Sequence, residues 1–222
     1  MKMIAMAALA VLGLTFLMPG AARASDQQNL VDEARITLDH LQTDQSFGNA
    51  KELLRKARAV LIVPNLVKAG FFLGGEGGDG VMLARSGRGT WTDPAFYTLA
   101  SASFGLQIGI QSAEVIMIIN SDKALNALEQ DQFKFGAQAG IAVVTLGAGA
   151  QAASSTALRD ADIIVWSSAS GAYAGVTLEG SLVKPRESYN EAYYSRPIAV
   201  REILNMNEGR NPGAGPLRAA LR

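Results

Sequence analysis

The sequence predicts a single-domain α+β fold. Apolar residues recur with helical spacing before residue 58, whereas between about residues 66 and 120 the period is nearer two and glycines punctuate it. The pattern indicates a glycine-rich, mostly antiparallel sheet, with two helices before it and short helices after it. An open sheet and a sheet curled into a barrel-like core both fit the pattern.

Residues 1–24 are set aside because they have the features of a secretory signal peptide. Lys2 gives a positive start, residues 3–18 are apolar, and Ala22-Arg23-Ala24 forms a small-x-small cleavage site. The apolar run of about 16 residues is shorter than the roughly 20 that a spanning helix needs. We therefore expect cleavage after Ala24, export to a bacterial periplasm, and a mature chain of 222 − 24 = 198 residues.

Two helices are expected first. In residues 26–45 one face is apolar, and in residues 48–58 Leu53, Leu54 and Ala57 share a face. The apolar run "AVLIVP" follows and predicts a buried strand that ends at Pro64.

The predicted sheet continues through "SFGLQIGIQ", which alternates as a strand does, and "EVIMIIN", whose continuous apolar run suits burial on both faces. Ser121 is a candidate cap for a helix over residues 121–132, and residues 176–182 alternate again. Near the end, Pro197 separates two short helices. Glycine and proline in "NEGRNPGAGP" then predict that residues 207–222 form a flexible tail.

Composition excludes several kinds of chemistry. The chain has no cysteine and one histidine, so disulfides, thiol nucleophiles and Cys/His zinc sites are ruled out. His40 falls on the polar side of the first helix and there is no G-x-S-x-G motif, which argues against a Ser-His-Asp hydrolase. Without Lys2 and Arg23 the charges are 18 basic and 20 acidic, a net −2, so general attraction to nucleic acid is not expected.

The stretch "FFLGGEGGDGVML" contains a GxGxxG pattern at Gly75, Gly77 and Gly80. A dinucleotide site requires a helix after this pattern, but strand-like "VMLAR" follows, and Glu76 and Asp79 would repel a phosphate. We therefore predict a strand-to-strand turn or bulge that needs positive φ or close backbone approach, and no nucleotide site. Calcium-loop spacing is also absent, so neither a metal nor another cofactor is expected.

Positive charge gathers on the second helix. Lys51, Arg55 and Arg58 are spaced i, i+4, i+7 and predict a cationic stripe, with Lys56 beside it. At about 1 kcal/mol per cation near an anionic membrane, these four less Glu52 give roughly 3 kcal/mol. That is weaker than a millimolar complex, at about 4 kcal/mol, and a solvated helix face is the simpler interpretation of the residues alone.

Five runs, in order over residues 50–204, resemble the SYLF domain family: "AKELLRKARAVLIVPNLVKAGFFLGGEGGDGVML", "GTWTDPAFYTLASASFGLQIGIQSAEVIMIIN", "FKFGAQAGIAVV", "ADIIVWSSASGAYAGVTLEGSLV" and "NEAYYSRPIAVREIL". The resemblance implies binding and not catalysis, because eukaryotic members bind phosphoinositides and other anionic phospholipids, and yeast members also touch actin. It implies lipid contact near the domain start, where Lys51, Arg55, Lys56 and Arg58 match by location and not by motif.

The leading expectation is therefore a bacterial, exported SYLF-like domain over residues 25–206 that is not an enzyme. It would bind anionic phospholipid or lipopolysaccharide at the cell envelope, where actin is absent. The alternative is an envelope scaffold or assembly factor that binds another protein, favoured by the small faces of a Gly-rich sheet and by the exposed tail. An unrecognised hydrolase that uses His40 or a carboxylate is a third interpretation.

Overall fold

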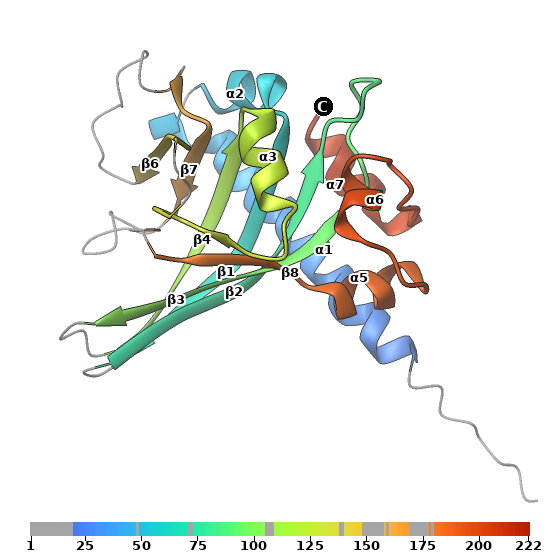
Figure 1. The fold of residues 1–222 in the computed structure, drawn as a ribbon, viewed down its shortest axis with the longest axis horizontal. Coiled ribbons are helices and arrows are strands. Elements are labelled where there is room, and N and C mark those ends of the chain that lie inside the picture. The colour runs from blue at the N-terminus through green and yellow to red at the C-terminus, as the bar shows by residue number, and fades with distance from the viewer. Residues whose placement is uncertain are drawn as a thin grey trace, which may run out of the picture.

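A computed structural model describes residues 20–47, 49–70, 73–104, 109–137, 140–147, 158, 160–168, 178 and 180–222. These residues form an eight-stranded sheet with the strand order β5-β8-β3-β2-β1-β4-β7-β6. The pairs are antiparallel, except that β6 runs parallel to β7. Figure 1 shows a strongly curled sheet, and its edge strands β5 and β6 are not paired with each other, so it is an open half-barrel. The predicted α+β fold is confirmed.

The described strands are β1 (Ala59–Gly70), β2 (Leu73–Ala84), β3 (Ala95–Phe104), β4 (Gly109–Ile119), β5 (Phe133–Lys134), β6 (Val143–Gly147), β7 (Ile163–Ser167) and β8 (Leu182–Pro185). The described helices are α1 (Gly20–Thr43), α2 (Ala50–Lys56), α3 (Asp122–Leu128), α5 (Glu187–Tyr194), α6 (Val200–Leu204) and α7 (Gly215–Ala220), with 3-10 turns η1 (Gln45–Phe47) and η3 (Pro212–Ala214).

The sheet separates two hydrophobic cores, because alternate residues of a strand point to opposite faces. In β1, Leu61 belongs to the core under α3 and α6, and Ile62 to the core under α1, α2 and α7. Figure 1 shows α3 and α1 on opposite sides of the sheet. Residues 115–119 of β4 are all buried, which confirms the strand predicted from their continuous apolar run.

Strand β1 does not end at Pro64, contrary to the prediction. Its register with β2 jumps from Ile62↔Val81 to Val67↔Gly77, and its register with β4 also shifts there. Proline cannot donate to the ladder, but a bulge leaves a residue unpaired and so tolerates it. The strand therefore passes through Pro64 and continues to Gly70.

The glycine block lies inside β2 and not in a turn, which corrects the turn prediction. A side chain at Gly78 would place its Cβ 2.5 Å from the backbone oxygen of Asn65, and one at Gly80 would place it 2.5 Å from that of Ile62. The predicted need for close backbone approach is thus confirmed at these two positions. They give room to the β1 bulge.

Three other predicted elements are confirmed, and two predicted strands lie partly outside the described residues. The first helix, the Ser121 cap, whose Oγ accepts from the Ala124 amide at 3.1 Å, and the two short helices around Pro197 are confirmed. Of the strand predicted through "SFGLQIGIQ", the first two residues belong to β3, which ends at Phe104, and the last three to β4, which begins at Gly109. Residues 105–108 between them lie outside the described part, as do residues 176, 177 and 179 of the stretch 176–182.

Residues 207–222, expected as a flexible tail, instead form η3 and α7 against the second core. Leu217 and Leu221 are buried, and the Trp91 indole Nε1 donates to the Leu221 carbonyl at 2.9 Å. Burial of these two leucines provides a driving force that glycine and proline content did not reveal.

The predicted signal peptide falls outside the described residues up to position 19, and α1 begins at Gly20. Among the residues that the structure describes, no helix combines the length and the apolar character that crossing a membrane requires.

Candidate functional site

The four cations predicted as lipid contacts lie on or directly after α2. Lys51, Arg55 and Lys56 are exposed on this short helix, whose buried residues Ala50 and Leu54 hold it on the second core. The charged outer face predicted for this packed helix is confirmed for Lys51 and Arg55, and Lys56 beside them is also exposed.

Arg58 does not extend the stripe, because α2 ends at Lys56 and the chain is already extended at Ala57. The Arg58 amide donates to the Ile119 carbonyl at 2.8 Å, so the residue sits at the start of the sheet. Its Nε contacts the Asp122 carboxylate at 2.6 Å, at the first residue of α3. The helical spacing that predicted three aligned cations therefore holds for two.

Two further arginines reach the same end of the molecule from the connection between β2 and β3. Arg85 donates from Nε to the Ala57 carbonyl and from Nη2 to the Leu54 carbonyl, both at 3.1 Å, and so satisfies free carbonyls at the end of α2. Its guanidinium lies 4.5 Å from the centroid of the Trp91 ring. Burial lowers the pKa of Arg85 from its ordinary value, but an arginine remains charged at neutral pH.

Arg88 is exposed at the tip of this connection, in the turn that Gly89 closes with a positive φ of 75°. Figure 1 shows α2 and this connection at the same end of the sheet, and the Arg85 contacts join them. We call this surface the basic end and define it by the cations Lys51, Arg55, Lys56, Arg58, Arg85 and Arg88.

The basic end carries more positive charge than its acids balance. Lys56 pairs with Glu52 at 2.6 Å and Arg58 with Asp122 at 2.6 Å. No ion pair joins the other four cations to the described residues. Lys51, Arg55 and Arg88 are exposed, so their field is available to an anionic surface, whereas Arg85 is half-buried and keeps its charge. Arg85 and Arg88 were not among the site residues predicted from the sequence. The one signal for them is "RSGRG", in which two arginines stand among residues typical of a turn.

The residues considered for catalysis occupy a different place. His40 Nδ1 lies 2.8 Å from Glu114 Oε1, which also accepts a hydrogen bond from Thr37 Oγ1 at 2.9 Å. Glu76 and Asp79 accept from the hydroxyls of Ser101 and Thr98 on β3, and Asp79 also pairs with Arg186. Within the described ranges no three His, Asp or Glu residues are arranged to hold a metal ion. The carboxylates of Glu76, Asp79 and Glu114 thus form hydrogen bonds or ion pairs within the fold.

A known protein family and several curated proteins match this chain in sequence. A family model described as "Las17-binding protein actin regulator", Ysc84, matches residues 100–222, more than half of the chain. Protein YSC84 of Saccharomyces cerevisiae is 28% identical over 194 residues, which cover 85% of this chain and 41% of that protein. The human SH3 domain-containing YSC84-like protein 1 is 31% identical over 154 residues, which cover 68% of this chain and 44% of that protein.

No solved structure matches the chain. The chain spans less than half the length of these curated relatives. The family description is one of binding and regulation and not of catalysis. The resemblance found in the sequence is confirmed, and the chain belongs to the Ysc84 (SYLF) family.

Proposed function

We propose that this protein binds anionic phospholipid surfaces through its basic end, without catalysis, in a bacterial cell envelope. The main support for this proposal is a group of cations that come from two separate segments and lie at one end of the molecule. They make no ion pair with the described residues, and they are Lys51, Arg55, Arg85 and Arg88. The predicted signal peptide supports the envelope, where lipopolysaccharide is a further anionic ligand.

The strength of such binding follows from the charge. At about 1 kcal/mol per cation near an anionic membrane, four unpaired cations give roughly 4 kcal/mol, close to a millimolar complex. The protein would thus bind reversibly and peripherally, and only where anionic lipid is abundant. The actin link in the family description is not carried over, because an exported bacterial chain would not meet actin.

Co-sedimentation with vesicles tests this proposal. Wild-type protein should pellet with phosphatidylglycerol or cardiolipin vesicles and not with phosphatidylcholine vesicles. The variant Lys51→Glu/Arg55→Glu should lose most of this binding, whereas Lys134→Glu/Lys184→Glu, two exposed residues of β5 and β8, should keep it. Equal pelleting of both variants with anionic vesicles would count against the basic end.

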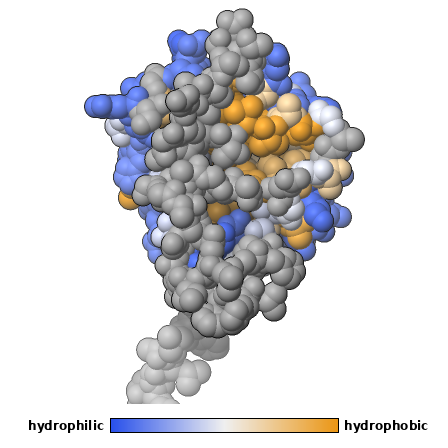
Figure 2. Space-filling model, turned by 90° about the vertical axis from the view of Figure 1, so that its left-hand side faces the viewer, coloured by the Kyte–Doolittle hydropathy of each residue, from blue (hydrophilic) through white to orange (hydrophobic). Residues whose placement is uncertain are grey.

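A scaffold that binds another envelope protein is the second candidate. The C-terminal segment does not offer an exposed tail to such a partner, because Leu217 and Leu221 are buried, but β6 is an edge strand and its Val143 is 38% exposed. Figure 2 shows an apolar area on the side of the molecule where β6 and β7 lie. Crosslinking in intact cells separates the candidates: one dominant protein adduct, together with no preference for anionic vesicles, would favour the scaffold.

A further inference from the structure

A second positive site lies where the C-terminal segment meets the connection between β2 and β3. There a cavity of about 280 Å³ is lined by two residues of that connection, by the turn after α6, and by the end of the chain. Three of the six lining residues are arginines and none is an acid. They are Thr90, Trp91, Asn207, Arg210, Arg218 and Arg222.

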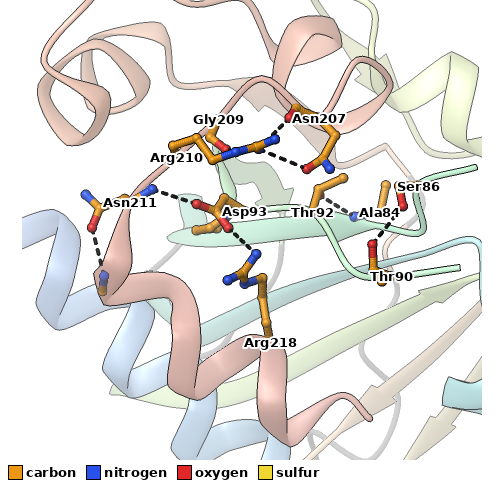
Figure 3. Close-up of polar contacts among 12 residues, drawn as sticks. Ala84, Ser86, Thr90, Thr92, Asp93, Asn207, Gly209, Arg210, Asn211 and Arg218 are labelled. Carbon is orange, nitrogen blue, oxygen red and sulfur yellow. Dashed lines mark hydrogen bonds and ion pairs between the residues drawn. The ribbon is translucent and has the colours of Figure 1, made fainter. Parts of the chain in front are cut away.

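The positions of two of these arginines are fixed by other contacts. Asp93, which is 2% exposed, lies 2.9 Å from Arg218 Nη1 and accepts the Asn211 amide at 2.7 Å. Arg210 donates to the carbonyls of Asn207 and Gly209. Figure 3 shows Arg218 reaching from α7 to Asp93, with Arg210 held on the other side of that carboxylate. Fixed guanidiniums lose less side-chain entropy when a ligand arrives.

Two observations show that the arginines lining the cavity keep hydrogen-bond donors or charge that the described residues do not use. Arg218 Nε is buried and has no hydrogen-bond partner among the described residues. Arg222 is exposed and makes no ion pair with any described residue. Both groups are donors only, so they are suited to an oxyanion.

The charge balance indicates which oxyanion. Among the side chains, three guanidiniums carry +3 and Asp93 carries −1, which leaves a side-chain charge of +2 around the cavity. A phosphate monoester carries about −1.5 to −2 at neutral pH and has three acceptor oxygens, whereas a phosphodiester or a carboxylate carries −1. Guanidinium groups bind phosphate in a planar, bidentate manner. The volume is below the range of about 300 to 1,000 Å³ usual for drug-sized ligands, so it fits a small group.

We propose that this arginine pocket binds a phosphate monoester, presented either by a membrane lipid or by a soluble molecule. The inference goes beyond surface attraction at the basic end, because it concerns one group in one cavity. It does not require α2.

Titration calorimetry with glycerol 3-phosphate tests the pocket in solution, with glycerol as the uncharged control ligand. Wild type should bind the ester, and Arg210→Gln/Arg222→Gln should weaken this binding at least tenfold. Arg201→Gln, an exposed arginine of α6 outside the pocket, should bind as wild type does. Circular dichroism and thermal melting of each variant would show that a loss is not due to unfolding.

Vesicles distinguish the source of the ester. Phosphatidic acid is a monoester and phosphatidylglycerol a diester, so vesicles of equal total charge should bind wild type better when they contain phosphatidic acid. Loss of this preference in Arg210→Gln/Arg222→Gln would assign the pocket to a lipid headgroup, whereas an effect on glycerol 3-phosphate alone would assign it to a soluble ester. If the pocket variant changes neither, the pocket assignment is wrong, and binding that depends on Lys51 and Arg55 is unaffected.

Discussion

The surface of α2 and the C-terminal segment carry similar positive charge but hold it in opposite ways. Lys51 and Arg55 extend from a short helix into solvent, whereas Arg218 is tied to a buried carboxylate and Leu221 to an indole. The exposed cations of α2 attract an anionic surface through their combined field, and no single position is required. The arginine tied to Asp93 has a fixed position, so it is suited to bind one anionic group of a ligand.

The largest expected difference concerns stability. Asp93→Ala would leave Arg218 and the Asn211 amide without their buried partner, and we expect a loss of about 2 to 3 kcal/mol. The lower end of the usual range applies because the Arg218 side chain is 37% exposed. Urea unfolding would measure it. A loss below about 0.5 kcal/mol would mean that Asp93 does not hold Arg218 in place, and the contrast with the exposed cations of α2 would be wrong.

Salt should separate the two kinds of charge by binding. Raising sodium chloride from 0.1 to 1 M shortens the Debye length from about 10 to about 3 Å, so binding to phosphatidylglycerol vesicles should fall more than tenfold. Binding of glycerol 3-phosphate to the partly buried arginines should fall much less. Equal salt dependence in co-sedimentation and in calorimetry would remove the distinction.

Trp91→Phe tests whether α7 is held as described. The substitution keeps an aromatic ring under Arg85 but removes the hydrogen bond to the Leu221 carbonyl, at an expected loss of about 1 kcal/mol. Amide hydrogen exchange should become faster in residues 215–222 and remain unchanged in α2. Unchanged exchange in α7 would show that this bond does not anchor it.

The smallest effect is expected on α2 itself. Glu52→Ala removes an exposed pair, in which Lys56 is 70% exposed, and should change the free energy of unfolding by less than about 0.5 kcal/mol. Vesicle binding should increase slightly, because a negative charge leaves the basic end. A loss of more than 1 kcal/mol in urea unfolding would mean that the pair is structural.

Sequence patterns predicted what depends on near neighbours. The burial of Leu54 and the exposure of Lys51 follow from helical spacing, and the Ser121 cap follows from a contact three residues away. The continuous apolar run also predicted the buried part of β4, because its residues are adjacent in the sequence.

Contacts between distant parts of the chain could not be read in this way. Pro64 is tolerated because Gly78 and Gly80 of another strand admit the bulge, and Asp93 becomes buried because Arg218 and the Asn211 amide reach it. Glycine and proline in the last sixteen residues suggested a loop, although burial of Leu217 decides their structure. Arg85 and Arg88 joined the candidate site only when the β2–β3 connection was placed beside α2.

The central proposal is that the basic end binds the membrane, and the absence of native cysteine makes this proposal directly measurable. Gly87→Cys would place a fluorophore at the basic end, where a new Cβ meets nothing within 4 Å, and Lys134→Cys would place one on β5. With phosphatidylglycerol vesicles that contain nitroxide lipid, we predict strong quenching at position 87 and weak quenching at position 134. Equal quenching at both positions, or stronger quenching at 134, would contradict the proposal that the basic end binds the membrane.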